Sequence, residues 1–233
     1  DIARQPLVPA FMTLFALAVA AMCAGIPVSD TSGAVRDALP LLGGQLARFQ
    51  AAYPVWSKFA AGFMLLFTGM CAGRITIRYN LYTVGTCLPI PLYAIVACGI
   101  ATGGNYLAGF AASMLLSLAT KNYCRAFCNG YGFDAIFRAS LYLGLMPLIY
   151  APALPLLLLL PLAVLLFRRT LREVAVATAG LLLPVFTACY VSWGTGAEFT
   201  APLIKLGQSA IEGMPLHLFL DIPLPALVMA GGI

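Results

Sequence analysis

The stretch VAVATAGLLLPVFTACYVSW (174–193) decides the fold class, because it contains no charged side chain. A helix that crosses a lipid bilayer needs about 20 predominantly apolar residues, and this stretch has that length. The whole chain agrees with it: 62% of its 233 residues are hydrophobic and 9% are charged. Soluble domains have roughly 45–50% apolar and 25% charged residues. The sequence therefore predicts a protein embedded in lipid.

Similar apolar stretches recur along the chain. The predicted spans are 6–28, 55–75, 81–100, 105–121, 135–151, 152–167, 174–193 and 215–233. They predict an all-α fold, a polytopic transmembrane helical bundle of about eight spans, in a single domain covering 1–233. The first span is too long for the apolar core of a signal peptide, which has roughly 7–15 residues. Because the chain starts without Met and ends without a flanking charge, we expect it to be part of a longer protein, incomplete at the C-terminus.

Basic residues predict the orientation of these spans. Nine of the 13 Lys and Arg residues fall on the side of the N-terminus. They are Arg4, Arg74, Arg78, Lys121, Arg125, Arg138, Arg168, Arg169 and Arg172. By the positive-inside rule this side is cytoplasmic, which predicts a multi-pass protein with a cytoplasmic N-terminus, in the inner (cytoplasmic) membrane if the host is a two-membrane bacterium. The net charge of +5 then reflects topology, and we expect no nucleic-acid partner.

Two segments are predicted to lie outside the membrane, at 29–54 and 194–214. Within 33–52, apolar residues recur at helical spacing with polar residues between them, which is typical of short interfacial helices. This loop could form a lid over a cavity, or it could rest on lipid head groups. Asp30, just after the first span, could act as a general base or could cap the interfacial helix. Arg36 and Arg48 could hold the phosphate of a lipid-linked donor or contact ordinary phospholipid.

Nothing in the sequence predicts a metal site or a cofactor. His217 is the only histidine. Five of the seven cysteines lie in or beside predicted spans, where Cys behaves as a small apolar residue, and Cys124 and Cys128 are at most half of a metal site. Asp221, inside the last predicted span, is a functional candidate because ionisable residues in membranes are costly.

Two resemblances follow from these segments. RITIRYNLY (74–82) and residues 133–184 resemble a family of uncharacterised bacterial polytopic inner-membrane proteins. The layout is similar to that of multi-span glycosyltransferases that use polyprenyl-phosphate sugars. Those enzymes have a cytoplasmic N-terminus, an acidic residue after the first span and interfacial helices in an outside loop. Asp30, the 33–52 loop and residues 144–169 occupy the corresponding places, although the first loop is short and a second acidic motif is missing.

This resemblance implies that Asp30 is the catalytic base and that Arg36, Arg48 or Lys205 contact the donor phosphate. The leading hypothesis is an inner-membrane protein of cell-envelope glycan or lipid-linked-sugar metabolism. Its partners would be membrane lipid and a polyprenyl-phosphate-linked sugar. The alternatives are a non-catalytic structural subunit that binds other membrane subunits, and a transporter of a lipid or hydrophobic solute.

Overall fold

The computed structural model describes residues 7–23, 41–79, 89–101, 105–128, 132–157 and 170–213, and every regular element in these ranges is a helix. They are α1 (Leu7–Cys23), α3 (Leu41–Ala52), α4 (Pro54–Arg78), α5 (Pro89–Ala101), α6 (Tyr106–Cys128), α7 (Phe133–Ile149), the short 3-10 helix η1 (Ala151–Ala153), α9 (Leu171–Gly194) and α10 (Ala201–Gly213). The all-α prediction is confirmed for these residues.

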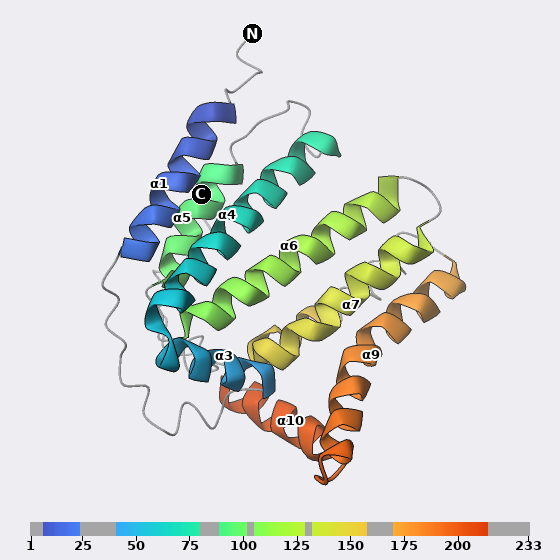
Figure 1. The fold of residues 1–233 in the computed structure, drawn as a ribbon. Coiled ribbons are helices and arrows are strands. Elements are labelled where there is room, and N and C mark those ends of the chain that lie inside the picture. Colours follow the sequence, from blue (N-terminus) through green and yellow to red (C-terminus); the bar gives the residue numbers. More distant parts are fainter. Residues whose placement is uncertain are drawn as a thin grey trace, which may run out of the picture.

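The long helices form a row in which each packs on the next. α4 contacts α6, α6 contacts α7 and α7 contacts α9, while α1 and α5 pack on α4 and on each other (Figure 1). α3 and α10 touch each other and lie where α4 and α6 begin and where α7 and α9 end (Figure 1). We call this the α3/α10 end. We call the opposite end, which carries Arg74, Arg78, Lys121, Arg125, Arg138 and Arg172, the basic end.

Two of the described helices, α4 and α9, are long and apolar enough to cross a membrane, and they contain the predicted spans 55–75 and 174–193. The count of eight spans is not supported. The predicted span 81–100 is described only from Pro89, where it is the helix α5, and 81–88 lies outside the described residues. The predicted span 152–167 opens with η1 and a turn, and its remainder from 158 lies outside the described residues, as does 215–233.

Many of the side chains at the helix contacts are small, although Leu14, Leu65 and Phe110 are also fully buried there. Of the buried hydrophobic residues in the described ranges, fourteen are alanines. In contrast, Trp56, Phe63, Val96 and Tyr190 are each at least 65% exposed. Small residues at helix contacts are typical of helices that associate in lipid, where the apolar exterior needs no cover.

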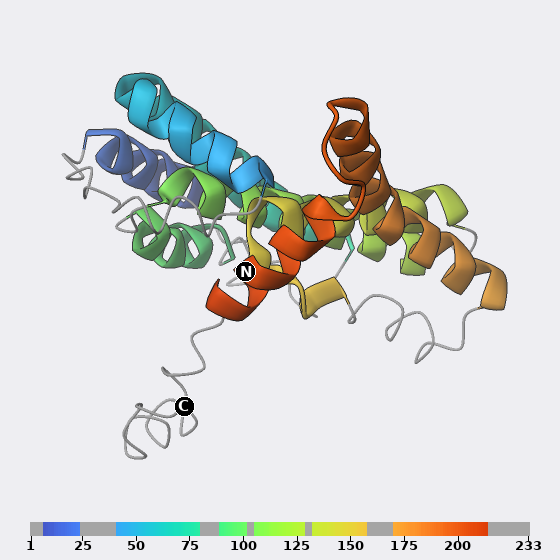
Figure 2. The ribbon, with the colours of Figure 1, turned by 90° about the horizontal axis from the view of Figure 1, so that it is seen from below.

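α7 and α9 approach each other so closely that their backbones touch. A Cβ atom added to Gly144 would lie 2.4 Å from the carbonyl oxygen of Leu181. A Cβ atom on Gly180 would lie 2.9 Å from the carbonyl oxygen of Phe137. Both glycines are therefore needed for this helix contact. Farther along, α9 contains Pro184 and changes direction (Figure 2), as helices do at an internal proline.

Two hydrogen-bonded pairs fasten α3 and the start of α4 to the start of α6. Gln50 Oε1 accepts a hydrogen bond from the backbone N–H of Leu107 at 3.4 Å, and the hydroxyls of Ser57 and Tyr106 pair with each other. The first N–H groups of a helix have no partner within it, so Gln50 satisfies one of them. The predicted loop is helical over Leu41–Ala52, and its interfacial position stays a prediction, whereas 33–40 lies outside the described residues.

The segment that was predicted as a second outside connector, 194–214, is helical over Ala201–Gly213. Pro202, Leu206 and Ser209 are buried on one side of α10, whereas Leu203 and Ile204 are exposed on the other. Its buried side faces α9, η1 and α3. α10 thereby closes the α3/α10 end together with α3.

Candidate functional site: a basic groove

The structure places only part of the site that the sequence predicted. Asp30 and Arg36 lie outside the described residues. Arg48 on α3 and Lys205 on α10 are both exposed at the α3/α10 end. Neither of them lines the cavities described below. The predicted phosphate contacts are therefore not brought together around a described cavity.

A groove of about 420 Å³ lies at the basic end between α1, α4, α5 and α6. Its apolar wall consists of Phe11, Phe67, Met70, Ile77 and Ile90. Three cations, Arg74, Arg78 and Lys121, also line it, and none of the described residues that line it is acidic. We call this site the basic groove.

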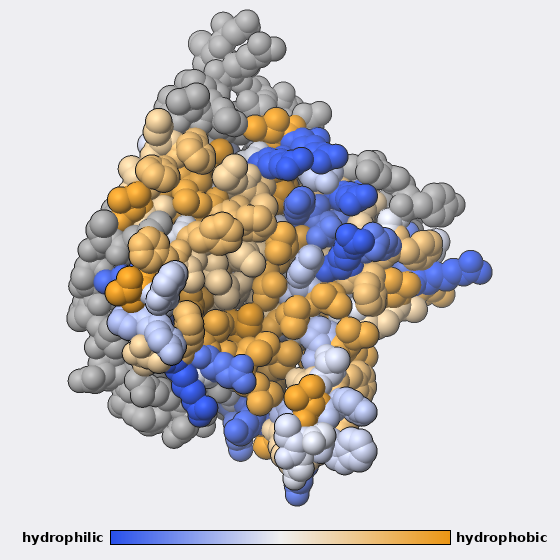
Figure 3. All heavy atoms as spheres, in the orientation of Figure 1, coloured by the Kyte–Doolittle hydropathy of each residue, from blue (hydrophilic) through white to orange (hydrophobic). Residues whose placement is uncertain are grey.

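The three cations come from two helices. Arg74 and Arg78 are four residues apart on α4, so they lie on one face of that helix, and both are exposed. Lys121 reaches the groove from α6 and is half-buried. Figure 3 shows hydrophilic side chains gathered where α4 and α6 end, next to a continuous apolar surface. The groove thus joins positive charge to a surface that can receive a hydrocarbon chain.

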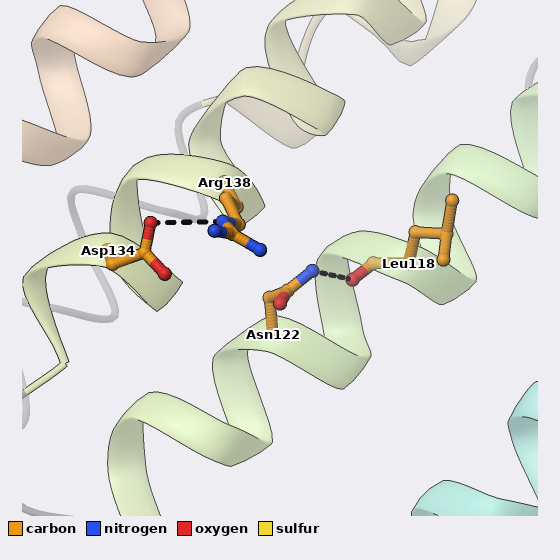
Figure 4. A network of polar contacts seen from close by, with 4 residues as sticks. All are labelled: Leu118, Asn122, Asp134 and Arg138. Carbon is orange, nitrogen blue, oxygen red and sulfur yellow. Dashed lines mark hydrogen bonds and ion pairs between the residues drawn. The ribbon is translucent and has the colours of Figure 1, made fainter.

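Arg138 on α7 is an arginine whose charge is compensated by an ion pair, which makes it a comparison for the cations of the basic groove. Its Nε donates to Asp134 Oδ1 at 3.0 Å, one turn earlier on α7, and the pair faces Asn122 of α6 (Figure 4). Asn122 itself donates to the carbonyl oxygen of Leu118 at 2.9 Å. Within the described ranges, no such ion pair engages Arg74, Arg78 or Lys121. Their charge is available to an anion.

Guanidinium groups bind phosphate through two parallel hydrogen bonds, and lysine adds a compact charge. Basic pockets between membrane helices on the cytoplasmic side are a known way to hold anionic lipid head groups. The basic groove has both the charge and the apolar wall that a phosphate-bearing lipid requires. In the sequence, Arg74, Arg78 and Lys121 were interpreted only as topology anchors. The sequence signal that could have indicated the groove is the helical spacing of Phe67, Met70, Arg74 and Ile77, which places them on one face of α4.

A second cavity lies between α4, α5 and α6 and has a volume of about 490 Å³. It shares no lining residue with the basic groove. Most of its polar lining consists of hydroxyl groups, and none of the described residues that line it is charged. We call it the hydroxyl cavity.

In the described part of the chain, no group of three His, Cys, Asp or Glu side chains is placed to hold a metal ion. Comparisons with known proteins give no relative: no family model, curated protein or solved structure matches the chain. The functional argument therefore depends on the geometry of the basic groove and of the hydroxyl cavity.

Proposed function

We propose that the chain is a polytopic membrane protein whose basic groove binds the phosphate group of an amphiphilic lipid. The membrane part is supported by the distribution of side chains. Trp56 and Trp193, the two tryptophans of the chain, are exposed near the α3/α10 end, and Arg and Lys gather at the other end. Aromatic residues at membrane interfaces and basic residues on the cytoplasmic side are both typical of helical membrane proteins.

The basic groove is the observation that carries the lipid part of the proposal. Three cations without an ion-pair partner in the described ranges lie beside Phe11, Phe67 and Ile77. A free phosphate would use the charges and leave the apolar wall uncovered. A lipid phosphate uses both, because its chains can lie along the outward-facing apolar side chains of α1 and α4.

The resemblance to polyprenyl-phosphate-sugar glycosyltransferases supplies the finer proposal, which is a role in lipid-linked-sugar metabolism of the bacterial cell envelope. In this proposal the helices lie in the inner membrane with the N-terminus cytoplasmic. The basic groove then opens on the cytoplasmic side. Arg48 and Lys205 then lie on the other side, where the sequence also predicts Asp30 and Arg36, and these four residues stay the candidates for a transfer reaction.

A pair of double variants tests lipid binding. Arg74→Gln/Arg78→Gln removes two charges from the groove, and each basic residue near a lipid phosphate contributes about 1 kcal/mol. We expect a fluorescent polyprenyl phosphate to bind to the double variant in detergent roughly 10- to 30-fold more weakly. The measurement is a fluorescence-anisotropy titration, with zwitterionic phosphatidylcholine as the competitor that should not displace the probe.

Arg125→Gln/Arg172→Gln is the matched control, since it removes the same charge from exposed arginines that do not line the groove. Its affinity for the probe should stay close to that of the parent protein. An equal loss in the two double variants would show that the probe senses only the overall charge of the basic end, and the groove would not be a binding site.

The catalytic part has a separate test, Asp30→Asn in the full-length protein. If Asp30 is the general base, loss of its carboxylate should lower lipid-linked-sugar turnover by about 100-fold or more, because general-base catalysis contributes roughly 10²–10⁴. Turnover is followed in membranes by the release of labelled sugar from its lipid. Unchanged turnover would remove the catalytic assignment and leave lipid binding untouched.

A non-catalytic subunit of an envelope complex is the second candidate. It is favoured by one observation: none of the described residues that line the basic groove, the hydroxyl cavity or the aromatic depression formed by Phe49, Trp56 and Phe63 is acidic. Gentle detergent extraction distinguishes the two candidates. Stable co-purifying membrane proteins would favour the subunit, whereas a monodisperse monomer would count against it.

A further inference from the structure

One face of α4 carries all the exposed residues of that helix from Trp56 to Arg78. They are Trp56, Phe59, Phe63, Met70, Arg74, Ile77 and Arg78. An α-helix has 3.6 residues per turn, so these positions fall within about a third of its circumference. The other sides of α4 pack on α1, α3, α5 and α6. We call this exposed surface the α4 face.

The α4 face joins two hollows of the surface. The aromatic depression has a volume of about 570 Å³, and its lining includes Trp56, Phe59 and Phe63. The basic groove begins one turn farther along, at Phe67. The rings of Phe63 and Phe67 are stacked with their centroids 6.4 Å apart, so the two hollows adjoin. Figure 3 shows apolar side chains over α4 up to the hydrophilic ones at its end. A hydrocarbon chain that leaves the basic groove therefore meets apolar side chains along the helix.

The length of the α4 face exceeds one leaflet of a bilayer. Arg74 and Trp56 are 18 positions apart, which corresponds to about 27 Å along the helix axis. The hydrocarbon core of a bilayer is about 30 Å thick, so one leaflet contributes about 15 Å. A chain that is anchored beside Arg74 and stays within its own leaflet reaches only to the level of Phe63. Trp56 and Phe59 are within reach only of a longer chain.

The size of the side chains on the α4 face favours a lipid chain over a protein helix as its occupant. Helices that associate in lipid use small residues at their contacts, as Gly144 and Gly180 do between α7 and α9. Trp56, Phe59 and Phe63 are large and exposed. Aromatic side chains have few rotatable bonds, so they provide a large contact area at little cost in conformational entropy. The cations at one end of the face match the charge of a phosphate.

We propose that the α4 face holds the hydrocarbon chain of the lipid whose phosphate lies in the basic groove, and that it selects a chain longer than one leaflet. The inference rests on the lipid-phosphate binding proposed above and adds chain length to charge as a basis of recognition. Trp56 and Phe59 are the residues that determine specificity, because a shorter chain does not reach them. Since the chain is already in hydrocarbon, its gain comes from many weak dispersion contacts with the rings.

Photolabelling of the full chain in phosphatidylcholine nanodiscs tests this placement. The probes are two alkyl phosphates that carry a diazirine at the chain end. Dodecyl phosphate has a chain of about 15 Å, the depth of one leaflet, and tetracosyl phosphate has a chain of about 30 Å, the depth of two. Tetracosyl phosphocholine with the same diazirine has the long chain without the net charge. Mass spectrometry identifies the labelled residues, and the probe concentration for half-maximal labelling measures the affinity.

We expect tetracosyl phosphate to label α4 around Trp56 and Phe59, and dodecyl phosphate to label it around Phe63. Trp56→Ala/Phe59→Ala should weaken the binding of tetracosyl phosphate roughly 3- to 10-fold, because the dispersion contacts of two rings are lost. The same variant should bind dodecyl phosphate as the parent does, which also shows that it is folded.

Trp193→Ala/Phe186→Ala is the matched control, since it removes the same two residue types from exposed positions on α9. It should bind both alkyl phosphates with the affinity of the parent protein. An equal loss in the two double variants would mean that the long chain contacts aromatic residues anywhere on the surface, and the α4 face would not be selective.

Two other results would overturn the proposal. Equal labelling near Trp56 by tetracosyl phosphocholine would make the α4 face an ordinary lipid contact. A change in the oligomeric mass of Trp56→Ala/Phe59→Ala, measured by light scattering, would assign the face to a protein partner.

Arg74→Gln/Arg78→Gln distinguishes this inference from the function on which it rests. If that variant labels with both alkyl phosphates as the parent does, the basic groove does not bind the phosphate and both proposals fail. If it weakens both probes while Trp56→Ala/Phe59→Ala weakens neither, phosphate binding stands and only the selection of chain length fails.

Discussion

Replacing Gly144 with Ala is expected to lower the melting temperature of the purified protein in detergent by roughly 3–10 °C. The added methyl group would meet the carbonyl oxygen of Leu181 at 2.4 Å, and the backbone of α9 cannot rotate away as a side chain can. The two helices must therefore move apart, which loosens the contact that joins α9 to the row. A thermal unfolding scan followed by tryptophan fluorescence measures the change, because Trp193 lies at the end of α9.

Alanine substitutions at two other glycines provide comparisons for the melting temperature of Gly144→Ala. Gly207 on α10 has open space where the methyl group would go, so Gly207→Ala should leave the melting temperature unchanged or raise it slightly. Gly69→Ala would meet the end of the Leu14 side chain at 2.6 Å. Because that side chain can rotate, its loss of stability should be smaller than that of Gly144→Ala. If all three variants had the same melting temperature, the close contact between α7 and α9 would be wrong.

The second large effect that we expect is the quenching of tryptophan fluorescence by brominated lipids, with a strength that depends on the depth of the bromine atoms in the bilayer. Trp56 is 68% exposed and Trp193 is 61% exposed, and both lie near the α3/α10 end. Tryptophan prefers the head-group level of a bilayer. In vesicles, lipids brominated close to the glycerol backbone should therefore quench the emission severalfold more than lipids brominated near the chain ends.

Trp56→Phe and Trp193→Phe isolate the two signals. Each single-tryptophan protein should show the same depth preference, since both residues are expected at one interface. A tryptophan that is quenched by aqueous iodide and by neither brominated lipid would place its helix end in water. That result would contradict the membrane placement of α4 or of α9, according to which tryptophan responds.

The sequence predicted helices best where the residues of the helix itself determine that it forms. An uninterrupted apolar run of sufficient length predicts α9, and residues 55–75 predict α4, because helix formation in lipid depends on local composition. Prolines limited the prediction elsewhere. The predicted span 152–167 contains Pro152 and Pro155 and opens with η1 and a turn, because proline interrupts the interior of an α-helix.

Features that depend on several helices could not be predicted in the same way. The basic groove needs Lys121 of α6 to lie beside Arg74 and Arg78 of α4, and periodicity gives no information about which helices are neighbours. Arg48 and Lys205 were predicted to share a site; the structure places both near the α3/α10 end but on no common cavity.

The hydrogen bond between Gln50 and Leu107 has a consequence for biosynthesis. Its two residues are 57 positions apart, and the Ser57–Tyr106 pair is separated by 49 positions. A ribosome releases the chain from its N-terminus, so α3 leaves it long before either partner on α6 exists. α3 cannot take its final place until the chain has grown past Leu107 and α6 has folded. The order of synthesis therefore makes the packing of α3 against α6 a late event in the folding of the α3/α10 end.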